Sequence, residues 1–290
     1  MAKKRWTAKD LPNLSGRTIV VTGASSGIGL VTARELSAHG ARVILAVRDV
    51  DKGRAGAKDF VGTFEVRELN LADLESIRTF AEAWTGDLDV LINNAGIMMA
   101  PAFRTIDDFE LHMGTNHLGP FALTNRLLPF ITDRVVTVSS ILHRRGHIHL
   151  EDLHFDVRPY AAMTAYQDSK LANLLFTLEL QRRLSEQGSA VRALAAHPGI
   201  ARTNLVAHVR GVNGLVNSLS QRLCNDAQNG ALPTLFAATQ DVPGASYVGP
   251  NGIGHLRGYP IIHKTSKRAM DDVMARRLWD VSAELTNTGK

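Results

Sequence analysis

Short apolar runs alternate with amphipathic stretches along most of this chain. The first run covers residues 17–22, precedes the sequence GASSGIG, and leads to a helix-like stretch at 30–39 that Gly40 ends. A second apolar run, Arg42–Val47, follows directly. Strand, glycine turn, helix and strand in this order predict a βαβ unit with two parallel strands.

The same alternation continues towards the C-terminus. Further strands are predicted at 63–68, 90–92, 135–139, 190–196 and 246–248, with helical stretches between most of them. The pattern predicts an α/β fold of the Rossmann type, a single doubly wound parallel sheet with helices on both faces and a ligand crevice at the carboxyl ends of the strands. We expect an N-terminal arm at 1–14, one domain at 15–290, and a surface helix at 269–285 in which Trp279 packs.

The composition narrows the class of protein. The chain has 290 residues, 44% hydrophobic and 21% charged, which is enough to bury a core without disulfides. Its one cysteine, Cys224, excludes an internal disulfide framework and fits a reducing compartment. The 33 basic and 28 acidic residues are mostly interspersed, which argues against a nucleic-acid partner. No run of about 18 uncharged apolar residues occurs, so we expect a cytoplasmic protein with no membrane partner.

The glycine-rich turn is the first candidate for chemistry. Gly23, Gly27 and Gly29 follow a strand and open a helix. Without side chains the backbone can approach a pyrophosphate closely, and the helix N-terminus stabilises its charge. The spacing is Gly-x-x-x-Gly-x-Gly rather than Gly-x-Gly-x-x-Gly, and taken alone it is also compatible with a structural loop.

Further motifs accompany this turn, and together they resemble the short-chain dehydrogenase/reductase family over residues 15–285. They are TGASSGIG at 22–29, NNAG at 93–96, Asn116 in NHLG, Ser140 after VTVS, Tyr166 and Lys170 in YQDSK, and Pro198-Gly199. The sequences LINNAGIMM, NHLGPF and SKLANLLFTLEL are most similar to the branch of retinol-dehydrogenase-like and protochlorophyllide-reductase-like enzymes. The resemblance implies that 15–290 is a single NADP-binding catalytic domain.

The end of the second strand indicates which cofactor is used. A carboxylate there accepts from the ribose hydroxyls of NAD, whereas an arginine accommodates the 2′-phosphate of NADP. Val47 occupies the expected carboxylate position and Arg48 follows it, which favours NADP(H), although Asp49 is adjacent. With the residues that the resemblance adds, the predicted cofactor site comprises Gly23, Ser25, Ser26, Gly27, Ile28, Gly29, Arg48, Asn70, Leu71, Asn94, Ala95, Gly96, Tyr166, Lys170, Pro198, Gly199, Ile200 and Thr203. Relatives usually carry Asp where this chain has Asn70.

Tyr166 and Lys170 are the candidate acid/base pair. Four residues apart, they share one face of a helix, and we expect the ammonium to lower the tyrosine pKa. Ser140 follows the 135–139 strand at the crevice. Strand alternation sends Ser140 and its competitor Ser139 to opposite faces, and the family resemblance selects Ser140. As a carbonyl accepts hydride, Ser140 would stabilise the oxygen and Tyr166 would transfer the proton. The resemblance implies that Lys170 also binds the nicotinamide ribose and that Asn116 holds a water.

Two segments leave alternatives open. The insertion after Ser140 carries His143, His147, His149 and His154, and we expect a solvated loop rather than a metal site. Residues 204–224 are compatible with a substrate lid or with an ordinary packed helix.

The function predicted from these features is NADPH-dependent reduction of a small aldehyde or ketone, or oxidation of the alcohol. Two alternatives are reduction of a conjugated carbon–carbon bond and non-catalytic sensing of NADP(H). Ile200 replaces the cysteine of light-driven enzymes, and the intact set of Asn116, Ser140, Tyr166 and Lys170 argues against a sensor. By analogy with the family, the helix at 171–184 is a candidate surface for a homo-oligomer.

Overall fold

The computed structural model describes residues 5–199 and 226–289. Its strands form one sheet in the order β3-β2-β1-β4-β5-β6-β7-β8. Strands β1 to β7 pair in parallel and β8 pairs antiparallel to β7. The strands are β1 (Thr18–Thr22), β2 (Arg42–Val47), β3 (Phe64–Glu68), β4 (Leu88–Asn93), β5 (Ile131–Val138), β6 (Arg192–Ala196), β7 (Tyr247–Pro250) and β8 (Pro260–His263). The predicted doubly wound sheet is thereby confirmed.

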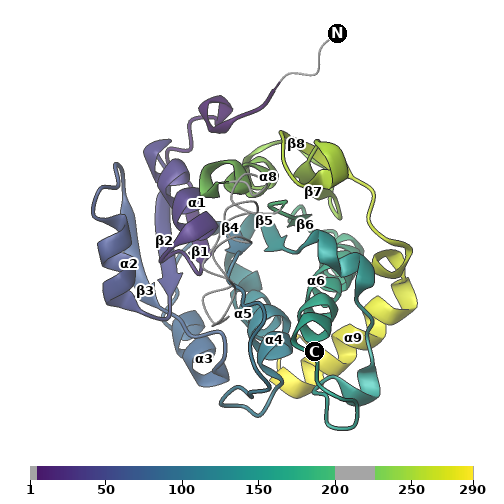
Figure 1. The fold of residues 1–290 in the computed structure, drawn as a ribbon. Coiled ribbons are helices and arrows are strands. Elements are labelled where there is room, and N and C mark those ends of the chain that lie inside the picture. Colours follow the sequence, from purple (N-terminus) through teal and green to yellow (C-terminus); the bar gives the residue numbers. More distant parts are fainter. Residues whose placement is uncertain (1–4, 200–225, 290) are drawn as a thin grey trace, which may run out of the picture.

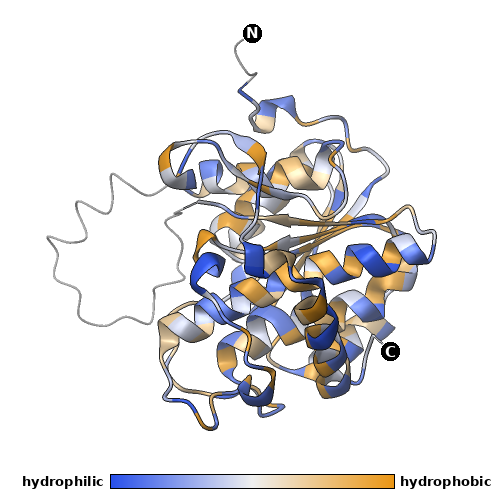
Figure 2. Cartoon of the chain, turned by 90° about the vertical axis from the view of Figure 1, so that its right-hand side faces the viewer, coloured by the Kyte–Doolittle hydropathy of each residue, from blue (hydrophilic) through white to orange (hydrophobic). Residues whose placement is uncertain are grey.

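Helices cover both faces of this sheet (Figures 1 and 2). One face packs against α1 and α8, and the other packs against α3, α5 and α6, with α9 lying alongside α6 on the outside. The described helices are α1 (Gly27–Ala38), α2 (Val50–Ala57), α3 (Leu74–Glu82), α4 (Leu111–Met113), α5 (Gly119–Leu127), α6 (Ala162–Glu186), α8 (Ala227–Thr239) and α9 (Asp272–Thr286). None of them is both long and apolar enough to cross a bilayer.

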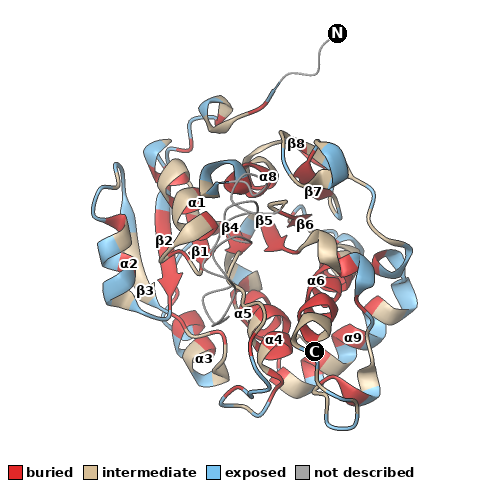
Figure 3. Cartoon of the chain, viewed as in Figure 1, coloured by how far each residue is buried: buried red, intermediate tan, exposed pale blue. Residues whose placement is uncertain are grey.

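The strands read as nearly continuous apolar runs because both of their faces are buried. In β1, Val20 packs towards α5 and α6, whereas its neighbour Val21 packs towards α1 and α8. Ile44 and Leu45 of β2 divide between the two faces in the same way. Figure 3 shows the central strands buried over most of their length. Strand alternation therefore distributes one apolar run between two cores.

The strand order reverses beside β1, and this reversal creates the crevice. From β1 the chain builds outward to β2 and β3, and then returns to place β4 on the other side of β1. The connections that leave β1 and β4 diverge to opposite faces, which opens a ligand site at their carboxyl ends. The position of the site in the fold therefore follows from the strand order alone.

Three features differ from the sequence-based expectations or add to them. The antiparallel edge strand β8, only four residues long, was not predicted. β5 begins at Ile131 rather than at residue 135. Within the expected N-terminal arm, Trp6 is buried in the main core and meets Phe236 of α8 edge-on, so this segment is anchored to the domain.

The helix at 171–184, the expected surface for a homo-oligomer, is largely buried within its own chain. Leu175 and Leu180 are at most 1% exposed, and α9 lies against α6. Trp279 of α9 stacks on Phe176 of α6 and meets Phe121 of α5 edge-on, at ring-centroid distances of 5.8 Å and 4.8 Å. The expected packing role of Trp279 is confirmed, and α9 covers the face of α6 that carries Phe176.

Trp279→Ala tests the attachment of α9. We expect the free energy of unfolding to fall by about 3–5 kcal/mol, because a buried aromatic ring is removed and a cavity remains. Val273→Ala, on the same helix but 68% exposed, should change it by less than about 0.5 kcal/mol. Urea denaturation of both variants makes the comparison, and equal effects would show that α9 does not depend on this contact.

Candidate active site

A cleft of about 710 Å³ opens at the carboxyl ends of the central strands. The predicted cofactor residues that line it are Gly23, Ser25, Ser26, Gly27, Ile28, Gly29, Arg48, Asn70, Leu71, Asn94, Ala95, Gly96, Tyr166, Lys170 and Pro198. Three other predicted residues, Asn116, Ser140 and Gly199, do not belong to this lining. Ile200, Thr203, Cys224 and the segment 204–224 lie outside the described residues.

The glycine turn is joined to the turn that follows β4. Thr22 Oγ1 accepts hydrogen bonds from the backbone N–H groups of Asn94 and Ala95, at 3.1 Å and 3.0 Å. Gly23 has φ +66°, and a Cβ on Gly29 would lie 2.6 Å from the Gly23 carbonyl oxygen. A side chain at either position would therefore strain or separate the turn. This cradle of backbone at the N-terminus of α1 fits a pyrophosphate group.

The end of β2 presents cations to the same cleft. Arg48 is exposed and lines it, and so does Lys52 in the first turn of α2. Asp49, the neighbouring carboxylate, is the N-cap of α2 and accepts from the Lys52 backbone N–H at 2.9 Å. Sequence reasoning missed Lys52. The sequence pattern Asp49-x-x-Lys52 could have identified this residue, because an Asp at the N-cap places the lysine in the first turn of the helix, beside the end of β2.

The two serines after β5 have different partners. Ser139 is buried and its hydroxyl donates to the Lys170 carbonyl at 2.7 Å, which fastens β5 to α6. Ser140 caps the 3₁₀ turn Ile141–Arg145, and its side chain lies close enough to Tyr166 to lower the pKa of the phenol. Of the two, Ser140 is therefore the one that can act together with Tyr166.

Tyr166 and Lys170 lie on one face of α6, at 6% and 3% exposure. Burial raises the pKa of Tyr166, and the hydrogen bond from Ser140 opposes that shift. Burial also lowers the pKa of Lys170 to about 8. The lysine Nζ donates to the Val138 carbonyl at 3.0 Å and lies 5.8 Å from the centre of the tyrosine ring. The expectation that Lys170 lowers the tyrosine pKa is wrong here, because loss of hydration dominates.

Asn116 lies behind the lining, on the π-helical turn Gly114–Leu118. Its Oδ1 accepts from the Ile97 N–H at 2.8 Å, and its Nδ2 donates to the Ile97 carbonyl at 3.0 Å and to Ser169 Oγ at 2.9 Å. A Cβ on Gly96 would lie 3.2 Å from both Asn116 Oδ1 and Lys170 Nζ. Asn116 therefore ties the loop after β4 to α6, directly beside the lysine.

The histidine-bearing insertion is only partly solvated, contrary to expectation. His143 is fully buried, and its Nδ1 lies 2.7 Å from the Ser140 carbonyl, so this ring supports the backbone of the serine. His147 is exposed, and His149 and His154 are partly buried. Within the described parts of the chain, no three or more His, Cys, Asp or Glu side chains gather as metal ligands would.

The lowered pKa of Lys170 predicts a pH dependence of stability. In the unfolded chain the lysine keeps its ordinary pKa of 10.5, so below pH 8 the native state bears the cost of a buried charge. This cost is relieved as the pH rises from 8 towards 10.5. The free energy of unfolding, measured relative to Lys170→Met, should rise by about 2 kcal/mol between about pH 7.5 and pH 9.5. Urea denaturation of both proteins at the two pH values checks this, and a constant difference would contradict it.

Comparison with known proteins gives the family of the chain. The model of the short chain dehydrogenase family matches residues 17–213. Human retinol dehydrogenase 11 is 42% identical, over 94% of this chain and 86% of its own length. An uncharacterized protein from Mycobacterium paratuberculosis has a crystal structure with a TM-score of 0.88 and 54% identity, covering 98% of each chain.

A blue fluorescent protein from a metagenomic library, crystallised with NADPH, is more distant. It matches with a TM-score of 0.63 and 28% identity, over 81% of this chain and 96% of its own. The family match, the relatives and the sheet lead to one conclusion: this chain is an oxidoreductase that belongs to the short-chain dehydrogenase family, in its retinol-dehydrogenase-like branch.

Proposed function

We propose that this protein is an NADPH-dependent oxidoreductase that reduces a small aldehyde or ketone, or oxidises the corresponding alcohol, with Tyr166 as the proton donor. The observation that carries the proposal is the cleft itself. It joins a pyrophosphate cradle and a pair of cations at one end to the buried pair of Tyr166 and Lys170 at the other. Its volume of about 710 Å³ is in the range of small-molecule and cofactor sites.

The preference for NADPH rests on charge at the end of β2. Arg48, Asp49 and Lys52 all line the cleft, and Asp49 Oδ1 accepts from the Lys52 backbone N–H in capping α2, so cations outnumber carboxylates at this strand end. A 2′-phosphate is a dianion that pairs well with guanidinium and ammonium groups, whereas the ribose hydroxyls of NAD need an acceptor. The NADPH complex of the metagenomic blue fluorescent protein is consistent with this choice.

The protonation states suit reduction. A bound nicotinamide supplies the hydride. The raised pKa of Tyr166 keeps its phenol protonated at neutral pH, which is the form that can donate to the oxygen of a carbonyl group as negative charge develops there. Ser140 donates a second hydrogen bond to that oxygen. Lys170, with its pKa near 8, can exchange a proton at neutral pH and reprotonate the tyrosine.

Cofactor preference is tested by titrating the protein with NADPH and with NADH, following fluorescence. Arg48→Ala should weaken NADPH binding about 10- to 100-fold, because a charge-assisted hydrogen bond is worth about 1.5–3 kcal/mol, and should change NADH binding by less than about threefold. Arg54→Ala, which removes an exposed cation of the adjacent helix α2, is the matched control. Equal affinity of the wild-type protein for the two cofactors would refute the assignment.

The catalytic role is tested with Tyr166→Phe, which keeps the ring and removes the hydroxyl. We expect kcat for carbonyl reduction to fall about 10²- to 10⁴-fold, the usual size of a general-acid contribution, while the Kd for NADPH stays within about threefold. Steady-state kinetics with a panel of aldehydes and ketones provides the measurement. Undiminished turnover would exclude Tyr166 as the proton donor, and a wild-type protein that binds NADPH without any turnover would favour the sensor.

A further inference from the structure

The loop that follows β4 is held in an unfavourable conformation beside the catalytic tyrosine. Ile97 and Ala100 line the cleft, and Met99 between them has φ +57°, in the left-handed region. A non-glycine residue there costs about 1–3 kcal/mol and persists only where its surroundings impose it. Asn116 fixes the loop at Ile97 through two hydrogen bonds. Something must also fix its other end.

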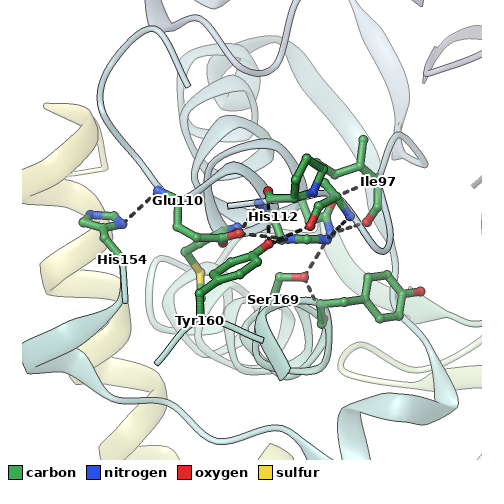
Figure 4. A network of polar contacts seen from close by, with 11 residues as sticks. Ile97, Glu110, His112, His154, Tyr160 and Ser169 are labelled. Carbon is green, nitrogen blue, oxygen red and sulfur yellow. Dashed lines mark hydrogen bonds and ion pairs between the residues drawn. The ribbon is translucent and has the colours of Figure 1, made fainter. Parts of the chain in front are cut away.

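His112 and Tyr160 hold that other end, at Ala100. The Ala100 N–H donates to His112 Nε2 at 3.2 Å, and the Tyr160 hydroxyl donates to the Ala100 carbonyl at 2.8 Å. Side chains from two different segments therefore hold both backbone polar groups of Ala100. Figure 4 shows the two side chains, His112 and Tyr160, close together. Burial, together with the negative charge of Glu110, raises the pKa of Tyr160, so its hydroxyl remains a donor.

Glu110 determines which nitrogen of His112 is the acceptor. Its carboxylate, 3% exposed, lies 2.8 Å from Nδ1 of the fully buried His112 and also accepts from two backbone N–H groups of α4. A carboxylate can only accept, so Nδ1 carries the hydrogen and Nε2 is left free for Ala100. Leu111, between the two residues, lines the cleft. Glu110 and His112 therefore lie directly behind the cleft wall and support it.

The same imidazole meets the catalytic tyrosine. The rings of His112 and Tyr166 are 6.4 Å apart between centroids and inclined by 72°, an edge-to-face contact. Tyr160 lies just before α6, the helix that carries Tyr166. The His112 side chain therefore connects the loop after β4, helix α4 and helix α6.

We infer that His112, oriented by Glu110, is a positioning residue that holds the Ile97–Ala100 wall and the Tyr166 ring at the spacing the reaction requires. The inference rests on the proposed function, since it assigns to His112 the geometry of that reaction. It differs from a role in folding alone, because its effect reaches the cleft through a single hydrogen bond to Ala100. Small displacements of reacting groups, of about 1 Å, can cost about 100-fold in rate.

Two substitutions of His112 separate its two nitrogens. In His112→Gln the amide oxygen reaches approximately the position of Nε2 and can still accept from Ala100, whereas the shorter side chain of His112→Asn reaches only the position of Nδ1. We expect His112→Asn to lower kcat about 10- to 100-fold, with the Kd for NADPH within about threefold, and His112→Gln to retain most of kcat. Tyr160→Phe, which removes only a partly exposed hydroxyl, should lower kcat less and covers the case in which His112→Asn does not fold.

The matched control is His117→Asn. His117 is equally buried on the neighbouring turn, but its Nε2 lies 2.9 Å from Ser282 of α9, away from the cleft. This variant should lose stability without losing kcat. A structural role alone would make the two asparagine variants alike.

Hydrogen exchange at the Ala100 amide gives a readout that needs no activity. It should be slow in the wild type and in His112→Gln, and at least about tenfold faster in His112→Asn, because the acceptor is lost. Unchanged exchange, or faster exchange with wild-type kcat, would overturn the inference. A wild-type protein that turns over no carbonyl would instead refute the proposed function, and the exchange comparison would still decide whether His112 holds the loop.

Discussion

The site depends above all on the contact between the turn after β1 and the turn after β4. These strands are neighbours at the point where the sheet order reverses, so their connections leave in opposite directions. Thr22 joins the turns by accepting from Asn94 and Ala95, and the absence of a side chain at Gly29 allows the close approach. The N-terminus of α1 and the loop at 94–101 consequently share one edge. This contact brings the proposed cofactor cradle to the cleft that α6 also lines.

Helix α6 supplies the other wall of the cleft, and several separate contacts fix its position. Ser139 fastens it to β5 and Asn116 fastens it to the loop after β4, while Trp279 of α9 packs against it from outside. This support is needed because α6 buries Lys170, whose charged form loses hydration there. The packing of α9 against α6, remote from the cleft, thus helps to hold the buried charge of Lys170 inside the cleft. The stability of α9 is in this way coupled to the geometry of the site.

The sequence predicted those parts that depend on local pattern. Apolar runs located the parallel strands, and the motifs identified the glycine turn and the choice of Ser140 over Ser139. Strand β8 begins with a proline, which argues against a strand in the sequence, and only one of its four residues is buried. The tyrosine pKa shift had the wrong expected direction because the depth of burial is a tertiary property that no spacing reveals. The contact of His112 with Ala100 could not be predicted from the sequence for the same reason. It joins a buried side chain to the backbone of a loop that has no sequence motif of its own.

The two ends of the cleft are governed by different forces. At the proposed adenosine end Arg48 is exposed, so its attraction for a 2′-phosphate would act partly through water and be screened by salt over about 10 Å at 0.1 M ionic strength. At the catalytic end Lys170 and Tyr166 are almost fully buried, and their interactions are screened far less. Discrimination between cofactors should therefore weaken with ionic strength, while the protonation equilibria of the catalytic pair should respond to it little. Cofactor selection, which depends on exposed charge, and proton transfer, which depends on burial, can consequently vary independently in this cleft.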